Sequence, residues 1–191
     1  MPDTVTMDTA QLDKLISERL DALLPQKLRE IEEGRTPSLT IIATKGTLDW
    51  AYPPFILAST AAALGWNAAI FFTFYGLQII HKENNKSLQV APLANPAMKL
   101  GSMGFPNIVG ALPGMTAMAT MMMKSWMAKE KVPNIPELLE MCQEGGVKLI
   151  ACQMSMDVMG IKKEQLIDGV ETAGAGTFLG YAAEAAITLF V

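Results

Sequence analysis

The sequence predicts an α/β protein with a doubly wound parallel sheet of about five strands, helices on both faces, and an amphipathic helical arm ahead of it. Two observations predict this fold. From Ser38 onward, short apolar runs alternate with helical segments, the order that produces a parallel sheet. The apolar runs Leu39–Ala43 and Ala68–Tyr75 contain few polar residues, as is typical of strands buried on both faces.

The individual elements follow from composition and from the residues that end them. Gly145 and Gly146 separate a helix from the strand after it, and a proline at position 136 is tolerated in a first helical turn. Residues 76–112 show poor periodicity. The strands are expected at 39–43, 67–75, 147–152 and 187–191, and the helices at 49–64, 114–129, 136–144, 155–159, 163–170 and 178–186.

Composition limits the function classes. The chain has 191 residues, 50% of them hydrophobic and 18% charged, which suits one domain plus a small extension. Its 15 Lys and Arg against 19 Asp and Glu leave no positive excess for nucleic-acid binding. Two cysteines do not make a disulfide framework, so a reducing, cytoplasmic compartment is expected.

A membrane span is the main question that composition raises, because residues 50–80 contain no Asp, Glu, Lys or Arg. Pro53 and Pro54 lie near the start of this run, and a Gly65-Trp66-Asn67 segment interrupts it. The helical piece before the glycine is about half a membrane thickness long. The N-terminus also lacks the early cations of a signal peptide. We therefore expect no spanning segment.

Residues 1–36 form a separate region, the N-terminal arm, ahead of a domain at 37–191. Asp8 and Gln11 resemble a capping box, and Pro25 should kink or restart the helix. Apolar side chains then recur at steps of three or four residues along one face: Leu12, Ile16, Leu20, Leu24, Leu28 and Ile31. Such a face must be buried on the chain's own core, on a neighbouring subunit or on lipid, and the basic polar face of a lipid-binding helix is missing.

In a parallel sheet the working groups lie beyond the carboxyl ends of the strands, which here carry Lys45, Tyr75 and Cys152. Cys152 precedes an expected helix start with Ser155 as a plausible N-cap, and free backbone N–H groups there favour a thiolate. Lys45 would add a cation. The alternative is a buried, inert cysteine. Position alone leaves both interpretations open.

Cys142 lies on the helix before the strand of Cys152. Counted from the intervening turn, the two residues differ in height by about 10 Å, beyond the ~7 Å Cα limit for a disulfide. We therefore predict that they do not pair within one chain, which leaves Cys142 as core packing or as a thiol used by another subunit. One His and two Cys cannot complete a zinc site, so no metal is expected.

Methionines are concentrated in the second half, with 12 of the 14 between Met98 and Met159. Met115, Met118, Met122 and Met123 share a helical face. A copper site would need their thioethers to converge on one point. Adaptable packing against a partner or subunit explains the same pattern.

Several motifs together resemble the DsrE/DsrF-like family, in its peroxiredoxin-like branch. They are Cys152-Gln-Met-Ser-Met-Asp-Val-Met-Gly160 after its strand, Lys45-Gly-Thr-Leu-Asp-Trp-Ala-Tyr-Pro-Pro-Phe55, Phe71-Phe-Thr-Phe-Tyr-Gly76 and Gly180-Tyr-Ala-Ala. The resemblance covers about residues 38–191.

The resemblance implies a doubly wound fold, homo-oligomers such as trimers or hexamers, and cytoplasmic sulfur trafficking. The sulfur-binding cysteine of the family falls on Cys152, which would hold sulfane sulfur as a persulfide and act as a sulfurtransferase. Cys142 would be an accessory thiol, and Lys45 with the helix start at Ser155 would stabilise the thiolate. TusA-like sulfur carriers and rhodanese-type donors are the expected partners, and thiol exchange needs no cofactor.

Two alternative functions remain open from the sequence. A thiol peroxidase would also use Cys152 and would need a resolving thiol. A non-catalytic oligomeric protein at a membrane edge would leave Cys152 slow toward alkylating agents.

Overall fold

The computed structural model describes residues 8–91, 99–100, 103–104 and 114–191. The chain divides into two compact units, Met1–Thr36 and Pro37–Val191. The first contains the helix α1 (Thr9–Gly34), and the second is an α/β unit. Each unit is described by itself.

The α/β unit is built on one five-stranded sheet with the strand order β6-β5-β2-β1-β7, and every neighbouring pair is parallel. The predicted fold class is confirmed. The strands are β1 (Ser38–Ala43), β2 (Asn67–Phe72), β5 (Lys148–Cys152), β6 (Val170–Ala173) and β7 (Ile187–Phe190).

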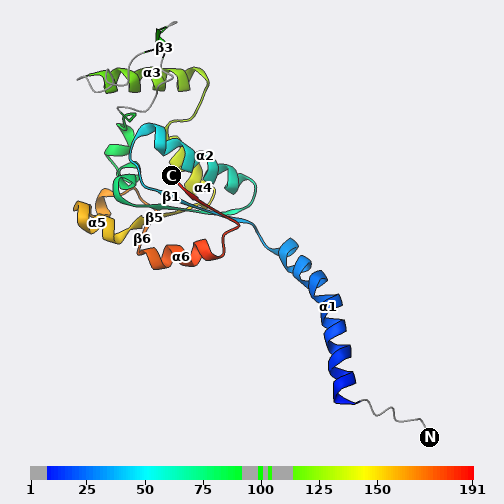
Figure 1. Cartoon of the computed structure of the whole chain (residues 1–191). Coiled ribbons are helices and arrows are strands. Elements are labelled where there is room, and N and C mark those ends of the chain that lie inside the picture. Colours follow the sequence, from blue (N-terminus) through cyan, green and yellow to red (C-terminus); the bar gives the residue numbers. More distant parts are fainter. Residues whose placement is uncertain (1–7, 92–98, 101–102, 105–113) are drawn as a thin grey trace. The chain divides into compact units, whose positions relative to one another are not determined.

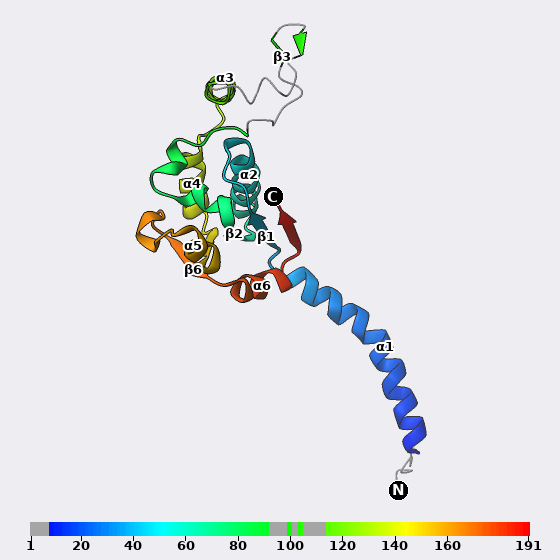
Figure 2. The same cartoon turned by 60° about the vertical axis from the view of Figure 1, so that its left-hand side comes forward.

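Helices cover both faces of this sheet. In Figures 1 and 2, α2 and α4 stay on one side of the strands and α6 stays on the other. The α-helices are α2 (Leu48–Ala63), α3 (Met115–Lys129), α4 (Ile135–Glu144), α5 (Gln153–Met159) and α6 (Ala175–Ala183). The smaller elements are the 3-10 helices η1 (Phe74–Ile80), η2 (Asn84–Lys86) and η4 (Lys163–Gln165), and an antiparallel pair, β3 (Lys99–Leu100) with β4 (Met103–Gly104).

The two faces bury different amounts of apolar surface. Because side chains alternate along a strand, Leu149 and Ala151 of β5 face the same side as α2 and α4 and belong to the large core. Ile150 and Cys152 point to the opposite side, into a second and much smaller cluster. That small cluster consists of Ala69, Phe71, Ile150, Cys152 and Phe178.

Three elements differ from the prediction, and one of them, α6, begins and ends three residues earlier than the helix expected at 178–186. The helix expected at 163–170 is wrong: only Lys163–Gln165 is helical, as the 3-10 turn η4, and Val170 begins the edge strand β6. The strand expected to reach Tyr75 ends at Phe72, because Phe74 begins η1. β6 has four residues of which Val170 alone is buried, so it lacks an apolar run.

The apolar run forms α2 and β2 as expected, and its two prolines lie inside the helix. α2 begins at Leu48, so Pro53 and Pro54 are its sixth and seventh residues. Over the ranges that the structure describes, no helix is both long and apolar enough to span a bilayer.

In the arm, α1 begins after Asp8, whose side chain makes no capping hydrogen bond, and the helix continues through Pro25. The expected capping box is therefore absent there. In the Met-rich region, Met123 and Met127 of α3 pack against the large core, whereas Met118 and Met121 are exposed. Most of the Gly- and Pro-rich stretch at 101–114 lies outside the described residues.

Candidate functional site: the carboxyl end of strand β5

Cys152 is the last residue of β5 and the N-cap of α5, at the carboxyl edge of the sheet. In the ladder it is level with Ala173, the last residue of β6, which leads through Gly174 into α6. The preceding residue, Ala151, is level with Phe72 at the end of β2. Three strand ends therefore surround the thiol, two of which lead directly into helices.

The thiol lies in an apolar cluster to which α6 contributes one buried side chain, that of Phe178. Cys152 is 3% exposed within its small apolar cluster. The rings of Phe71 and Phe178 stack there with centroids 4.8 Å apart and planes 18° apart. Tyr181 and Ala182 of α6 are partly buried against the same cluster, and the Lys148 ammonium of β5 donates to the Tyr181 hydroxyl at 3.0 Å, whereas Leu179 is 62% exposed. Access to the sulfur therefore depends on movement of α6.

Ser155 connects this edge to the central strand. Its hydroxyl oxygen lies 2.7 Å from that of Thr73, the residue that follows β2, and the Ser155 side chain is fully buried. The expectation that Ser155 caps α5 is wrong, because the N-cap is Cys152 and Ser155 is the third residue of the helix. Its role in the structure is to join α5 to the end of β2.

The residue after Thr73 has an unusual backbone. Phe74 has a φ of 48°, which places a bulky side chain in the left-handed region. Both Phe74 and Tyr75 are exposed, at 50% and 69%. Strained backbone of this kind is frequent at functional sites, and sequence reasoning did not identify it. The motif at Phe71–Gly76 was the available signal.

A close approach of two loops explains the glycine in that motif. Gly76 donates its N–H to the carbonyl oxygen of Thr44 at 3.1 Å, and a Cβ at Gly76 would collide with the carbonyl of Ala43. The loop after β1 and the turn after β2 are therefore packed together at the carboxyl edge.

Cys142 lies on the other side of the sheet from Cys152. It is fully buried in the large core, and its Sγ donates to the carbonyl oxygen of Phe55 at 3.7 Å. Burial raises the pKa of the Cys142 thiol to about 11. Both thiols are free. The structure therefore separates the two cysteines and surrounds Cys142 with packing.

Lys45 is engaged elsewhere. Its ammonium lies 3.1 Å from the centroid of the Trp50 ring, a cation–π contact within the loop after β1 and the start of α2. β2 lies between β1 and β5 in the sheet, which separates those two strands by about 10 Å. The predicted role of Lys45 beside the thiolate thus stays a prediction.

His81 is buried, and its Nδ1 accepts the N–H of Glu83 at 3.3 Å. Within the described parts of the chain, no group of three or more His, Cys, Asp or Glu side chains is placed to hold a metal ion. The carboxyl edge of β5 carries a free thiol, that of Cys152.

Comparison with known proteins agrees with the motifs. The profile of the DsrE/DsrF/DrsH-like family matches residues 35–190. The chain belongs to this family. It is 55% identical over 157 residues to the sulfur carrier protein DsrE2 of Allochromatium vinosum, covering 80% of this chain and 97% of that protein.

More distant matches extend over a similar length. The uncharacterized protein YrkE of Bacillus subtilis is 33% identical over 157 residues, which is 82% of this chain and 98% of YrkE. The crystal structure of the ychN protein from E. coli aligns with a TM-score of 0.47 and 14% identity, over 82% of this chain and 100% of that one.

Proposed function

We propose that this protein is a sulfur carrier that binds sulfane sulfur as a persulfide on Cys152 and passes it to an acceptor protein. The observation that carries the proposal is the position of Cys152, a free thiol at the carboxyl end of β5 where α5 begins. The 55% identity with a protein named as a sulfur carrier supports the same function.

The proposed reaction is thiol exchange. The Cys152 thiolate attacks the outer sulfur of a donor persulfide, R–S–SH; a new S–S bond forms at Cys152, the donor S–S bond breaks, and the donor leaves as the thiolate R–S⁻. An acceptor thiolate then attacks the outer sulfur of the Cys152 persulfide and releases the Cys152 thiolate. Each step conserves oxidation state, so neither requires a cofactor.

Three features of the site suit this exchange. The backbone N–H groups at the start of a helix favour an anionic sulfur. The apolar cluster around Cys152 keeps water away from a bound persulfide. Displacement of α6, which covers Cys152 through Phe178, Tyr181 and Ala182, would let a partner thiol reach the sulfur.

The remaining parts of the proposal concern partners and assembly. We include TusA-like sulfur carriers and rhodanese-type donors as partners, a sulfurtransferase activity, a homo-oligomeric state such as a trimer or hexamer, and a reducing, cytoplasmic compartment. The free state of both cysteines is compatible with such a compartment.

Mass spectrometry of the intact protein tests the central claim. After incubation with a small-molecule persulfide, the protein should gain about 32 Da, the mass of one sulfur atom, and lose it on treatment with a thiol. Cys142→Ser should load normally, whereas Cys152→Ser should not load. Loading of Cys152→Ser, or no loading of the wild-type protein, would overturn the proposal.

The alternative of a thiol peroxidase is less well supported. A peroxidase that works within one chain needs a second thiol to resolve the sulfenic acid, and Cys142 lies on the opposite face of the sheet from Cys152. Treatment with hydrogen peroxide separates the two functions: a peroxidase turns over many equivalents in the presence of thiol, whereas a sulfur carrier does not.

A further inference from the structure

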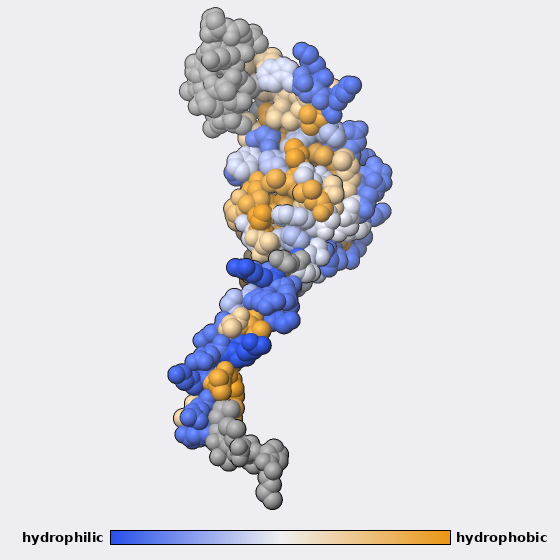
Figure 3. Space-filling view, turned by 90° about the vertical axis from the view of Figure 1, so that its right-hand side faces the viewer, coloured by the Kyte–Doolittle hydropathy of each residue, from blue (hydrophilic) through white to orange (hydrophobic). Residues whose placement is uncertain are grey.

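The apolar face of α1 is exposed along the whole helix. We call Leu12, Ile16, Leu20, Leu24, Leu28 and Ile31 the leucine stripe. Each of these side chains is between 46% and 65% exposed. Figure 3 shows apolar side chains at the surface of α1 among its charged ones. The predicted amphipathic face is thus present in α1, and its apolar side chains are exposed.

A helix of this kind needs a packing partner. Amphipathic helices gain most of their stability from the packing of the apolar face, and Pro25 within α1 removes one backbone hydrogen bond. The family match begins only at residue 35. The alignment with DsrE2 covers 97% of DsrE2 but 80% of this chain. The stripe is therefore an addition to the family domain, and the core of that domain does not require it.

Charge argues against lipid as the partner. Residues 1–36 contain eight acidic and five basic side chains. Anionic membrane surfaces attract helices whose polar face is rich in Lys and Arg. Acids and bases are instead mixed along α1, which suits association with a protein surface that also carries both signs.

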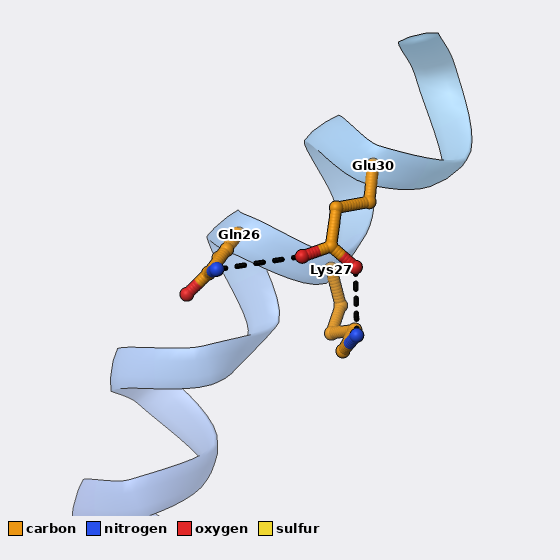
Figure 4. Close-up of polar contacts among 3 residues, drawn as sticks. All are labelled: Gln26, Lys27 and Glu30. Atoms are coloured by element: carbon orange, nitrogen blue, oxygen red, sulfur yellow. Dashed lines mark hydrogen bonds and ion pairs between the residues drawn. The ribbon is translucent and has the colours of Figure 1, made fainter. Parts of the chain in front are cut away.

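Two charged residues lie within the leucine stripe. Asp13 lies seven residues before Leu20, and Lys27 lies seven residues after it. At about 100° per residue, both side chains therefore point within about 20° of the direction of the Leu20 side chain, viewed along the helix axis. The Lys27 ammonium lies 2.6 Å from a carboxylate oxygen of Glu30, whose other oxygen accepts from Gln26 at 3.4 Å (Figure 4). This contact keeps the Lys27 side chain close to the helix surface.

We propose that α1 pairs with α1 of a second copy of this chain, antiparallel and centred on Leu20. In this register the sequence is complementary to itself: Leu20 meets Leu20, Ile16 meets Leu24, and Leu12 meets Leu28. Asp13 of each copy faces Lys27 of the other, so the two embedded charges form two reciprocal ion pairs. A parallel pair in register would place Asp13 against Asp13 and Lys27 against Lys27.

The size of this contact is adequate. Packing the leucine stripes of two copies against one another removes on the order of 1,000 Å² of apolar surface, close to the size at which specific interfaces begin. The arm thus joins two chains through a surface that is separate from the Cys152 site.

Mixed cysteine cross-linking of the full-length chain tests the orientation. One batch carries Asp13→Cys and another Lys27→Cys, both with Cys152→Ser; the batches are mixed, mildly oxidised and mapped by peptide mass spectrometry. The mixed 13–27 disulfide should exceed both same-site disulfides at least tenfold, because equal positions in an antiparallel pair are about 21 Å apart along the axis. Predominant 13–13 disulfides would overturn the antiparallel assignment.

The matched control is Glu18→Cys, which lies on the side of α1 away from the stripe. If disulfides at positions 13 and 27 form no more often than disulfides of Glu18→Cys, the pairing itself is overturned. The proposal is also overturned if the wild-type chain sediments with phosphatidylserine vesicles and no disulfides form at positions 13 and 27, because lipid would then be the partner.

Charge reversal gives an independent test. Leu20→Cys reports pairing in either orientation, since Leu20 meets its own copy in both. In an antiparallel pair, adding Asp13→Lys should lower the disulfide yield at position 20 about fivefold, and adding Lys27→Asp as well should restore it. Parallel pairing predicts no change from Asp13→Lys, because it exchanges one like-charged pair for another. That result would overturn the proposal.

Discussion

The two faces of the central sheet bury the two cysteines in different ways. On one face, α2 and α4 close over a large core that contains Cys142 and the Phe55 carbonyl to which its thiol donates. On the other face, α6 covers Cys152 through Phe178 and a cluster of five buried residues. Both thiols are inaccessible in the static structure, but the free energy needed to expose them should differ greatly. The free energy needed to expose each sulfur, rather than its exposed area in the folded state, therefore distinguishes a reactive thiol from a structural one.

The largest expected difference is in alkylation. A pKa of about 11 for Cys142 leaves it about 100-fold less thiolate at neutral pH than a thiol at the ordinary 9.0, and its burial among α2, α4 and the sheet slows it further. With iodoacetamide and peptide mapping, Cys142 should therefore react at least 100-fold more slowly in the native protein than in urea, and more slowly than Cys152 in the native protein. Equal rates would contradict the comparison and would favour a non-catalytic protein.

Stability at high pH is the next effect. Because burial raises the pKa of Cys142 above its unfolded value of 9.0, the folded state binds the thiol proton more tightly. This contribution is fully present below pH 9 and is lost as the pH rises toward 11, a fall of about 3 kcal/mol in the free energy of unfolding. Urea denaturation at several pH values measures it.

The control for this measurement is the Cys142→Ala variant. Cys142→Ala should flatten the pH dependence between 9 and 11, although other groups such as Tyr52, whose pKa is also raised by burial, still contribute. An unchanged slope in Cys142→Ala would show that its proton is not linked to folding.

Sequence reasoning located the strand of Cys152, because a strand depends on a local pattern, and it predicted that the two thiols do not pair. It placed them at different heights, whereas the structure buries them on opposite faces of the sheet. The buried apolar run that ends at Cys152 predicts the strand, and the two glycines before it predict the turn that leads into the strand. The same patterns did not place Lys45. The distance between Lys45 and Cys152 depends on the order of the strands in the sheet. In that order β2 lies between β1 and β5, which is decided by tertiary packing and not by a local sequence pattern.

Two other errors have local physical causes. Serine is a frequent N-cap, but β5 runs directly into α5, so Cys152 occupies the cap position and Ser155 becomes an interior residue. β6 was missed because an edge strand with one buried residue carries almost no apolar signal. The cover from Phe178 could not be predicted either, since it depends on contact between β2 and α6.

Loosening the thinner face should have a moderate effect. Phe178→Ala removes the ring that stacks on Phe71 and should lower the free energy of unfolding by about 2–4 kcal/mol. It should also raise the alkylation rate of Cys152 about tenfold, since α6 loses its buried anchor. Leu179→Ala, on the same helix but 62% exposed, should change neither quantity. A slower reaction of Cys152 in Phe178→Ala would contradict the role of α6 as a cover.

The smallest effect concerns the link between α5 and the end of β2. Thr73→Val removes one partner of the 2.7 Å contact with Ser155 and leaves a buried hydroxyl unpaired, which should cost about 1–2 kcal/mol. Ser155→Ala should cost a similar amount. The double variant should cost less than the sum of the two, with a coupling of about 1 kcal/mol by denaturant unfolding. Additive single effects would show that the two hydroxyl groups act independently.

If the contact also positions the strained turn at Phe74, Thr73→Val should slow sulfur loading of Cys152 while leaving its alkylation rate unchanged.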